Sequence, residues 1–206
     1  MRDLRRVTTR FRGGARGRAW ILALAVLGCG PVQVIQRSEP PSALAGERAM
    51  TVHHDWSRLQ VKGGACTRPT TPLEPEAVYT AEMTDALRDE YARSKAALAE
   101  ALVTAMRAAA PGIAFTVLEA RSAAGVHLEI RHESLQVGWF GLCQAPTGIS
   151  SRFTWTRDGR ATDVIVVTGG GPSSTRTLVD LPGMSAAGQQ LGATAGAYLL
   201  QVRGGS

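Results

Sequence analysis

Apolar residues recur every three or four positions over two long stretches of the chain, and this spacing predicts two helices. The first stretch runs from Glu76 to Ala110, and Pro111-Gly112 ends it because proline cannot continue a helix. The second runs from Met184 to Val202, and we expect it to pack tightly on a sheet. Its glycines repeat at four-residue spacing, which allows a close approach of a neighbouring backbone; they are Gly188, Gly192 and Gly196.

Outside these two stretches, apolar residues alternate with polar ones, and this alternation predicts β-strands. Trp56–Lys62 is the first such segment. Ile113–Glu119 and Gly125–Arg131 follow the long helix, and we expect them to form a hairpin. The apolar positions change phase after His132, so the sequence predicts a break in this strand near Glu133-Ser134.

The clearest hairpin pattern spans Ile149 to Thr168, with Asp158-Gly159 at its centre. This dipeptide suits a two-residue type I′ turn, because both positions need a positive φ angle. The turn fixes the expected cross-strand pairs, which are Arg157 with Arg160, Trp155 with Thr162 and Phe153 with Val164.

The order of these elements is a strand, a long helix, several antiparallel strands and a terminal helix. This order predicts an α+β fold, a two-layer sandwich in which the long helix and the C-terminal helix pack on an antiparallel sheet. We expect one domain over residues 51–206. Gly169–Gly171 and Pro172–Ser174 are interpreted as a loop, and Leu178–Leu181 as a short edge strand.

The beginning of the chain has the composition of an export signal. Seven arginines precede the apolar run Ala19–Cys29, and small residues close that run. A basic start followed by a short apolar segment is typical of a secretory leader. The run is far shorter than the ~20 residues needed to span a bilayer.

Val26-Leu27-Gly28-Cys29 resembles the lipobox of bacterial lipoproteins. The resemblance implies that residues 1–28 are a signal peptide and that Cys29 becomes the acylated first residue. Residues 29–50 are then expected to be a flexible tether. The alternatives are a plain signal peptide, an uncleaved anchor, and a short strand at Val32–Ile35 within the tether. Export through the general secretory route is expected, with the Arg5-Arg6 pair leaving the twin-arginine route as the alternative.

The positive charge of the chain belongs to the leader. Of 23 basic and 17 acidic residues, residues 1–28 hold seven and one, which leaves 23 − 7 = 16 basic and 17 − 1 = 16 acidic residues. The remainder is neutral overall. We therefore expect no nucleic-acid partner, because such proteins carry a basic footprint.

If Cys29 carries lipid, Cys66 and Cys143 are the two cysteines that remain. Exported proteins meet an oxidising compartment, which favours a disulfide between them. The bond would close a loop of 143 − 66 + 1 = 78 residues and contribute about 4.5 kcal/mol in the chain-entropy model. The alternative is two free buried thiols.

Four histidines and nearby carboxylates are candidates for chemistry. His53-His54-Asp55 suggests a metal, but adjacent residues on an extended chain point in opposite directions. His127 and His132 flank a polar pattern, in which residues 127, 129, 131 and 133 share one face of a straight strand. We interpret His53-His54-Asp55 as an exposed polar stretch and residues 127–133 as a polar sheet face, and we expect neither a metal nor a cofactor.

Gly183-Met184-Ser185-Ala186-Ala187 is similar to the nucleophile elbow of hydrolases, but it lacks the final glycine, and no acidic or histidine partner follows it. We interpret it as the start of a helix. The glycine-rich loop is the expected binding segment, because loops often carry function; its candidate residues are Gly169, Gly170, Gly171, Ser173 and Ser174.

The sequence thus predicts a membrane-anchored envelope lipoprotein whose domain binds or assembles with an envelope protein partner. Its architecture and leader resemble those of auxiliary lipoproteins of transport systems. Gly30, rather than Asp, after Cys29 resembles the sorting pattern of enteric lipoproteins, which implies the outer membrane, with the domain in the periplasm. The alternatives are a periplasmic module for a small ligand or polymer, and a small hydrolase.

Overall fold

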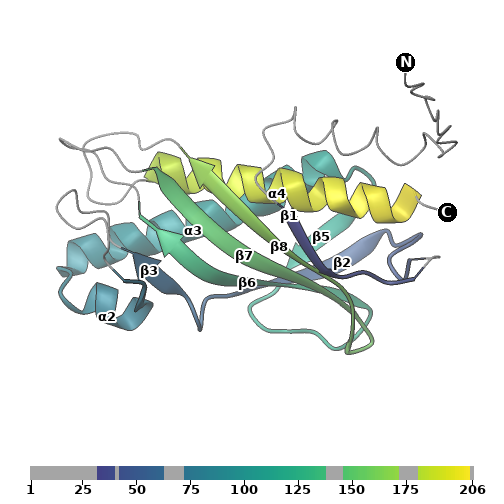
Figure 1. The fold of residues 1–206 in the computed structure, drawn as a ribbon, viewed down its shortest axis with the longest axis horizontal. Coiled ribbons are helices and arrows are strands. Elements are labelled where there is room, and N and C mark those ends of the chain that lie inside the picture. Colours follow the sequence, from purple (N-terminus) through teal and green to yellow (C-terminus); the bar gives the residue numbers. More distant parts are fainter. Residues whose placement is uncertain (1–31, 40–41, 63–71, 138–145, 172–180, 205–206) are drawn as a thin grey trace, which may run out of the picture.

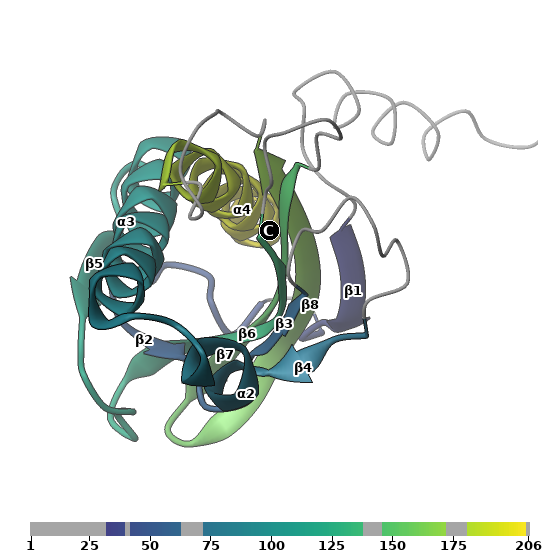
Figure 2. The same ribbon diagram turned by 90° about the vertical axis from the view of Figure 1, so that its left-hand side faces the viewer.

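The computed structural model describes residues 32–39, 42–62, 72–137, 146–171 and 181–204. The leader, Cys29, Cys66, Cys143, Ser173 and Ser174 lie outside these ranges, so the predictions made for them stay predictions. The described residues form one sheet with two long helices on one of its faces (Figure 1). The sheet curves around the helices, and the hydrophobic core lies between the two layers (Figure 2).

The sheet has eight strands in the described part of the chain, and its main order is β1-β8-β7-β6-β2-β5. β3 runs beside the end of β6, and β4 pairs with β3. The strands are β1 (Val32–Gln36), β2 (Ala49–Asp55), β3 (Gln60–Lys62), β4 (Glu74–Pro75), β5 (Ala114–Val117), β6 (Val126–Gln136), β7 (Thr147–Arg157) and β8 (Arg160–Gly171). The helices are α2 (Glu76–Ala81), α3 (Asp85–Ala109) and α4 (Leu181–Gly204).

The predicted α+β class, with both long helices packed on one sheet, is confirmed. The sheet itself is mixed and not purely antiparallel, because β2 pairs in parallel with both β5 and β6. β3 also runs parallel to β6. The remaining pairs, β1–β8, β6–β7, β7–β8 and β3–β4, are antiparallel.

The helix predicted over 76–110 is two helices. α2 ends at Ala81, and α3 begins after Thr84, whose side chain accepts a hydrogen bond from the backbone N–H of Leu87. A threonine in this extended conformation is a favourable N-cap, so it starts a new helix. The apolar spacing continues across the break, and the pattern therefore could not reveal it.

The predicted closing helix is confirmed, but its glycines pack on α3 and not on the sheet. A Cβ atom at Gly188 would meet the backbone of Leu98, and one at Gly192 would meet the backbone of Leu102. At Gly196 it would lie 2.6 Å from the Cβ of Ala109. The contacts advance in the same direction along both helices, so α3 and α4 run parallel at close range.

The expected hairpin between residues 113–119 and 125–131 does not form. Both segments are strands, but β2 lies between them and pairs in parallel with each. The connection over residues 118–125 must therefore cross β2. The predicted break in the second strand is confirmed as an irregularity between His132 and Ser134.

The β7–β8 hairpin is confirmed, with a bulge that the sequence did not predict. Asp158 and Gly159 have φ angles of 49° and 78°, as a type I′ turn requires. Arg157 faces Arg160 as expected. An extra residue near Trp155 then shifts the pairing by one position, so that Trp155 faces Asp163 and Phe153 faces Ile165.

Part of the segment predicted as a tether, residues 29–50, is folded. Val32–Gln36 is β1, the alternative that the sequence left open, and it pairs with β8. Leu44 is fully buried in the core. β2 begins at Ala49 and was not predicted. Of the strand predicted at Trp56–Lys62, only the last three residues are β3.

A buried carboxylate fastens this segment to the domain. Asp163 accepts a hydrogen bond from the Ser38 hydroxyl at 2.9 Å and another from the Tyr198 hydroxyl of α4 at 2.8 Å. Burial raises the pKa of Tyr198, and the neighbouring Asp163 raises it further. The folded domain therefore starts well before residue 51.

Gly169–Gly171 also differ from their prediction, because they form the end of β8 and not a loop. A Cβ atom at Gly169 would lie 2.8 Å from the carbonyl oxygen of Ala187 in α4. Glycine is needed here because the helix crosses the strand so closely. Leu181, expected in an edge strand, is the first residue of α4.

Candidate functional site

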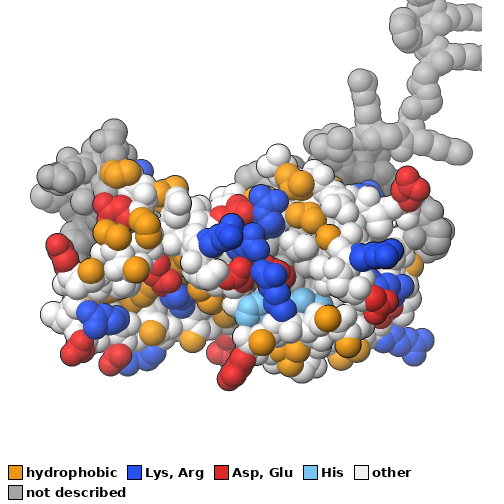
Figure 3. Space-filling view, turned by 90° about the horizontal axis from the view of Figure 1, so that it is seen from below, with side chains coloured by type: hydrophobic (Ala, Val, Ile, Leu, Met, Phe, Trp, Pro, Cys, Tyr) orange, Lys and Arg blue, Asp and Glu red, His pale blue; other side chains and the backbone are white. Residues whose placement is uncertain are grey.

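The face of the sheet opposite the helices carries a concentration of charged side chains. It is formed by the outward residues of β2, β6 and β7, which alternate with the core residues along each strand. Figure 3 views this side of the molecule and shows Lys and Arg side chains gathered near its centre, beside acidic residues and histidines. We call this surface the arginine face. It contains Asp55, Arg121, Glu129, Arg131, Glu133 and Arg152.

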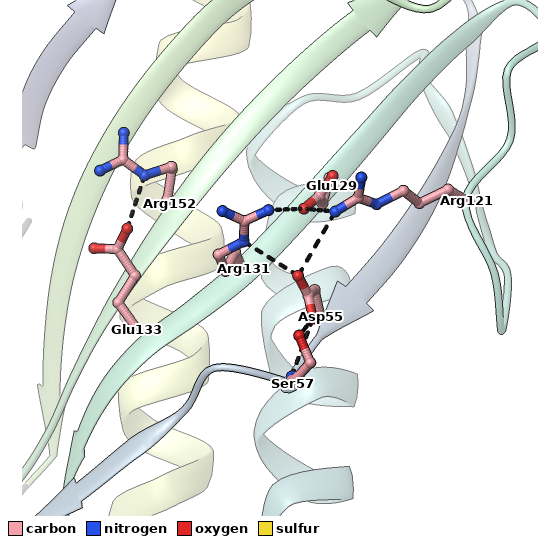
Figure 4. Close-up of polar contacts among 7 residues, drawn as sticks. All are labelled: Asp55, Ser57, Arg121, Glu129, Arg131, Glu133 and Arg152. Atoms are coloured by element: carbon pink, nitrogen blue, oxygen red, sulfur yellow. Dashed lines mark hydrogen bonds and ion pairs between the residues drawn. The ribbon is translucent and has the colours of Figure 1, made fainter. Parts of the chain in front are cut away.

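Four of these side chains form a closed ionic network (Figure 4). Arg131 donates from Nε to Asp55 at 3.1 Å and from Nη2 to Glu129 at 3.0 Å. Arg121 donates from Nη2 to Glu129 at 2.6 Å and lies 3.7 Å from Asp55. Two guanidinium groups thus share two carboxylates.

Three separate parts of the chain supply this network. Asp55 is the last residue of β2, and its carboxylate accepts hydrogen bonds from the backbone N–H and the hydroxyl of Ser57 at 3.0 and 2.6 Å. Glu129 and Arg131 are two residues apart on β6 and therefore point to the same side. Arg121 belongs to the connection that crosses from β5 to β6. The network fastens that connection to the sheet.

The acidic and the basic side chains of the network lie at different depths. The side chains of Asp55 and Glu129 are each 12% exposed, whereas those of Arg131 and Arg121 are 30% and 57% exposed. The carboxylates therefore lie beneath the guanidinium groups. The guanidinium groups form a positive layer, which is the part of the network most exposed to solvent.

Hydrogen bonds and neighbouring charges stabilise the ionised forms of Asp55 and Arg131. Burial alone would raise the pKa of Asp55, but the hydrogen bonds from Ser57 and the charge and hydrogen bond of Arg131 outweigh it and lower the pKa to about 2. The hydrogen bond to Asp55 raises the pKa of Arg131. These shifts keep Asp55 and Arg131 charged at neutral pH.

A second ion pair extends the arginine face onto β7. Arg152 donates from Nε to Glu133 at 2.7 Å, and both side chains are about one third exposed at 35% and 34%. Glu133 lies at the irregularity in β6, and alternation along the strand places it on the same side as Glu129 and Arg131. The positive layer thus spans three elements.

Two histidines border the network. The ring of His127 lies on that of His53, with centroids 6.5 Å apart, and its Nδ1 is 2.8 Å from the hydroxyl of Thr51. Burial lowers the pKa of His127, and the charge of His53 lowers it further. Among the described residues, no group of three histidine, cysteine or acidic side chains could hold a metal ion.

The other two histidines lie on the core side of the sheet. His132 Nδ1 is 2.9 Å from the Ser151 hydroxyl, and its Nε2 is 3.0 Å from His54 Nδ1. The Trp56 ring stacks on His132 at 3.7 Å, and Lys95 lies over Trp56. A serine beside a linked pair of histidines has the composition of a nucleophilic site. Ser151 and His132 are both fully buried, however, so no substrate reaches them in this structure.

Three of the residues predicted for binding, Gly169, Gly170 and Gly171, end β8, and Ser173 and Ser174 lie outside the described residues. Gly169 and Gly171 are buried where β8 meets α4. Ser185 lies within α4, as expected, and lines an open groove of about 750 Å³ between α3 and α4. The groove is formed largely by alanines, which offer little that could select a ligand.

The sequence pattern identified half of the arginine face. It placed Glu129, Arg131 and Glu133 on one polar face. It missed Asp55, which was assigned to an exposed stretch, and Arg121 and Arg152. Arg152 could have been found from the alternation along β7, because its neighbours Ser151 and Phe153 face the core and it must therefore face outward. Arg121 could not, since its position depends on β2 lying between β5 and β6.

No family model matches the sequence, and no curated protein matches it. Among the described residues, no helix is long and apolar enough to cross a membrane.

Three solved structures resemble this chain at low identity. A PelC dodecamer from Paraburkholderia phytofirmans is 17% identical with a TM-score of 0.44, over 82% of this chain and 97% of that one. A DUF330 protein from Xanthomonas campestris is 12% identical with a TM-score of 0.46, over 81% and 91%. A methionine variant of the PelC dodecamer is 16% identical with a TM-score of 0.45, over 82% and 98%. Likenesses at this level do not establish what this chain binds or how it assembles.

Proposed function

We propose that this chain is an exported bacterial envelope lipoprotein, acylated at Cys29, whose domain binds an acidic protein partner through the arginine face. The observation that carries the proposal is the layering within the network, in which the more exposed guanidinium groups of Arg121 and Arg131 cover the nearly buried carboxylates of Asp55 and Glu129. The anchor rests on the leader and the lipobox-like Val26–Cys29. We place the protein at the outer membrane, with the domain in the periplasm.

The arginines keep hydrogen-bond donors available for a partner. A guanidinium group has five N–H donors. Within the described part of the chain, Arg152 uses Nε for Glu133, and Arg121 uses Nη2 for its carboxylates. The remaining N–H groups have no hydrogen-bond partner there. A carboxylate from a partner can accept two parallel hydrogen bonds from such a group.

The sheet also holds these groups in place before binding. Each arginine is already fixed by an ion pair on a regular strand or by the network, so less side-chain entropy is lost when a partner arrives. A broad sheet face suits a protein surface better than a small molecule, which needs a concave pocket. These two features favour the binding reading over the alternatives of a small-ligand module and a hydrolase.

Removing positive charge from the arginine face should weaken binding without unfolding the domain. We expect the double variant Arg121→Ser and Arg152→Ser to recover several-fold less partner when the lipidated protein is purified after mild cross-linking. Stability should change by only about 1 kcal/mol per pair, because partly exposed ion pairs contribute little. The matched control is Arg88→Ser, which removes an exposed arginine from α3. Equal recovery with both variants would show that the arginine face is not the binding surface.

Acylation at Cys29 is tested separately. Metabolic labelling with palmitate should mark the wild-type protein and leave Cys29→Ala unlabelled, because the lipobox cysteine is the attachment point. Two or more acyl chains give stable anchoring, since each buried CH₂ contributes ~0.8 kcal/mol. Equal labelling of both proteins would refute the anchor.

The fold supports the proposed disulfide between Cys66 and Cys143. The backbone N–H of Val137 donates to the carbonyl oxygen of Lys62 at 3.1 Å, so the ends of β6 and β3 lie side by side. Cys66 follows the end of β3 by four residues, and Cys143 follows the end of β6 by seven. Peptide mapping without reductant should find the linked pair in protein taken from the envelope. Complete alkylation of both thiols would contradict it.

A further inference from the structure

β1 is an apolar edge strand that the described part of the chain leaves uncovered. All five of its residues are exposed, and it pairs with β8 on one side only. Val32, Val34 and Ile35 are 39%, 49% and 48% exposed, and they make up three of the seven large hydrophobic side chains exposed among the described residues. An exposed apolar edge strand normally has a partner, because natural edge strands are otherwise kept short or charged.

The strand begins three residues after Cys29. Three residues of extended chain span at most ~11 Å. The acyl chains that we propose on Cys29 enter the bilayer at its surface, and the headgroup layer on each side of the hydrocarbon is several ångströms thick. The start of β1 must therefore lie within or directly above the headgroups.

The attachment of β1 to the domain is rigid. The Gln36 side chain donates to the carbonyl oxygens of Ala161 and Thr162 at 3.2 and 3.4 Å. Directly after the strand, Ser38 is held by Asp163 through both its backbone N–H and its hydroxyl. In this structure β1 is thus part of the sheet and not a free tether. Its position near the anchor determines how the whole domain faces the membrane.

From these observations we infer that β1 is a membrane-contacting edge, which lies in the lipid headgroup layer with its apolar side chains toward the bilayer. This inference rests on the acylation of Cys29. The free backbone groups on the outer side of β1 need hydrogen-bond partners, which headgroups and interfacial water supply and hydrocarbon does not. Arg37, exposed and directly after the strand, adds attraction to anionic lipid.

The opposite edge of the sheet offers a matched control. Val117 of β5 is 52% exposed, and its exposure is similar to the 49% of Val34. β5 lies at the far end of the strand order from β1. A probe at Val117 should therefore stay in water when a probe at Val34 contacts lipid.

The test uses the full, lipidated chain in vesicles of phosphatidylethanolamine and phosphatidylglycerol that contain brominated lipid. Flotation of the vesicles reports the anchor, and quenching of an added tryptophan reports the strand. The Val34→Trp variant should lose most of the emission that it adds over wild type, whereas the Val117→Trp variant should keep it. Val34→Glu should retain flotation through the anchor.

The outcomes separate the two proposals. If the protein floats but Val34→Trp is quenched no more than Val117→Trp, the anchor stands and the membrane-contacting edge is refuted. The same conclusion follows if Val34→Glu converts a dimer to a monomer while Val34→Trp stays unquenched, because a second copy then covers β1. If the wild-type chain does not float, the anchor is refuted and the inference about β1 with it.

Discussion

Replacing Gly192 with alanine should destabilise the domain by about 3 kcal/mol, although glycine-to-alanine changes inside helices ordinarily stabilise by up to about 1 kcal/mol. The added methyl group would collide with the carbonyl group of Leu102 in α3 and lie 2.9 Å from the Cβ of Ala105. The obstacle is helix backbone, which cannot turn aside as a flexible side chain can. The two parallel helices would have to separate, and contacts along their whole length would loosen.

Gly204 provides the control for this prediction. It lies at the end of the same helix, and a Cβ atom there would meet nothing within 4 Å. Gly204→Ala should leave stability unchanged or raise it slightly. Urea unfolding followed by circular dichroism measures both variants. A Gly192→Ala protein as stable as Gly204→Ala would show that α3 and α4 do not pack as described.

Acid should destabilise the domain between about pH 6.5 and pH 4, because two histidines are buried in their neutral form. Burial lowers the pKa of His54 to about 4, and the charge of His53 contributes. Burial also lowers the pKa of His132, with further contributions from His54 and Lys95. In the unfolded chain both histidines bind a proton near their ordinary value of about 6.5.

The lowered pKa values of His54 and His132 make the domain less stable in acid. Below about pH 6.5 the unfolded state binds more protons than the folded state, so stability falls as the pH falls through this range. For His54 alone the shift corresponds to a loss of up to about 3 kcal/mol at pH 4. Denaturant unfolding at several pH values should show this slope for the wild type and a clearly shallower one for His54→Gln. The control His53→Gln removes a histidine from the opposite face of β2 and should keep most of the slope. Identical slopes for the wild type and His54→Gln would contradict the buried, neutral state.

The parts of the fold that local patterns determine could be predicted from the sequence. The closing helix follows from its apolar spacing, and the β7–β8 turn follows from Asp158-Gly159, whose positive φ angles the structure reproduces. The phase change after His132 also correctly located an irregularity in β6. Each of these features depends on neighbouring residues only.

The errors concern partners that are distant in sequence. Nothing near Val117 or Val126 indicates that β2 will lie between their strands, so a hairpin was the simplest expectation. β2 itself was missed because His54 stands where an apolar residue would complete its alternation. β1 was left as an alternative because it lies in a segment that is rich in proline and small residues and has no sustained apolar period.

The candidate site also combines residues that local patterns predict with residues whose partners are distant in sequence. The polar face of β6 could be predicted from alternation, and it supplies Glu129 and Arg131. The network that they join depends on Arg121, which reaches them only because the connection after β5 crosses β2. The glycine-rich segment was interpreted as a binding loop because glycine is also common in flexible loops. At Gly169 the glycine instead makes room for α4.

The central claim is that the arginine face receives the partner, and site-specific photo-cross-linking in living cells tests it most directly. A photoreactive residue is placed at Thr154 on the uncovered face of β7, or at Gln189 on the outward side of α4, in the full chain with its own leader. We expect Thr154 to capture one acidic protein, with capture reduced several-fold by Arg152→Ser, and Gln189 to capture none. Capture of the partner from Gln189 and not from Thr154 would contradict the account.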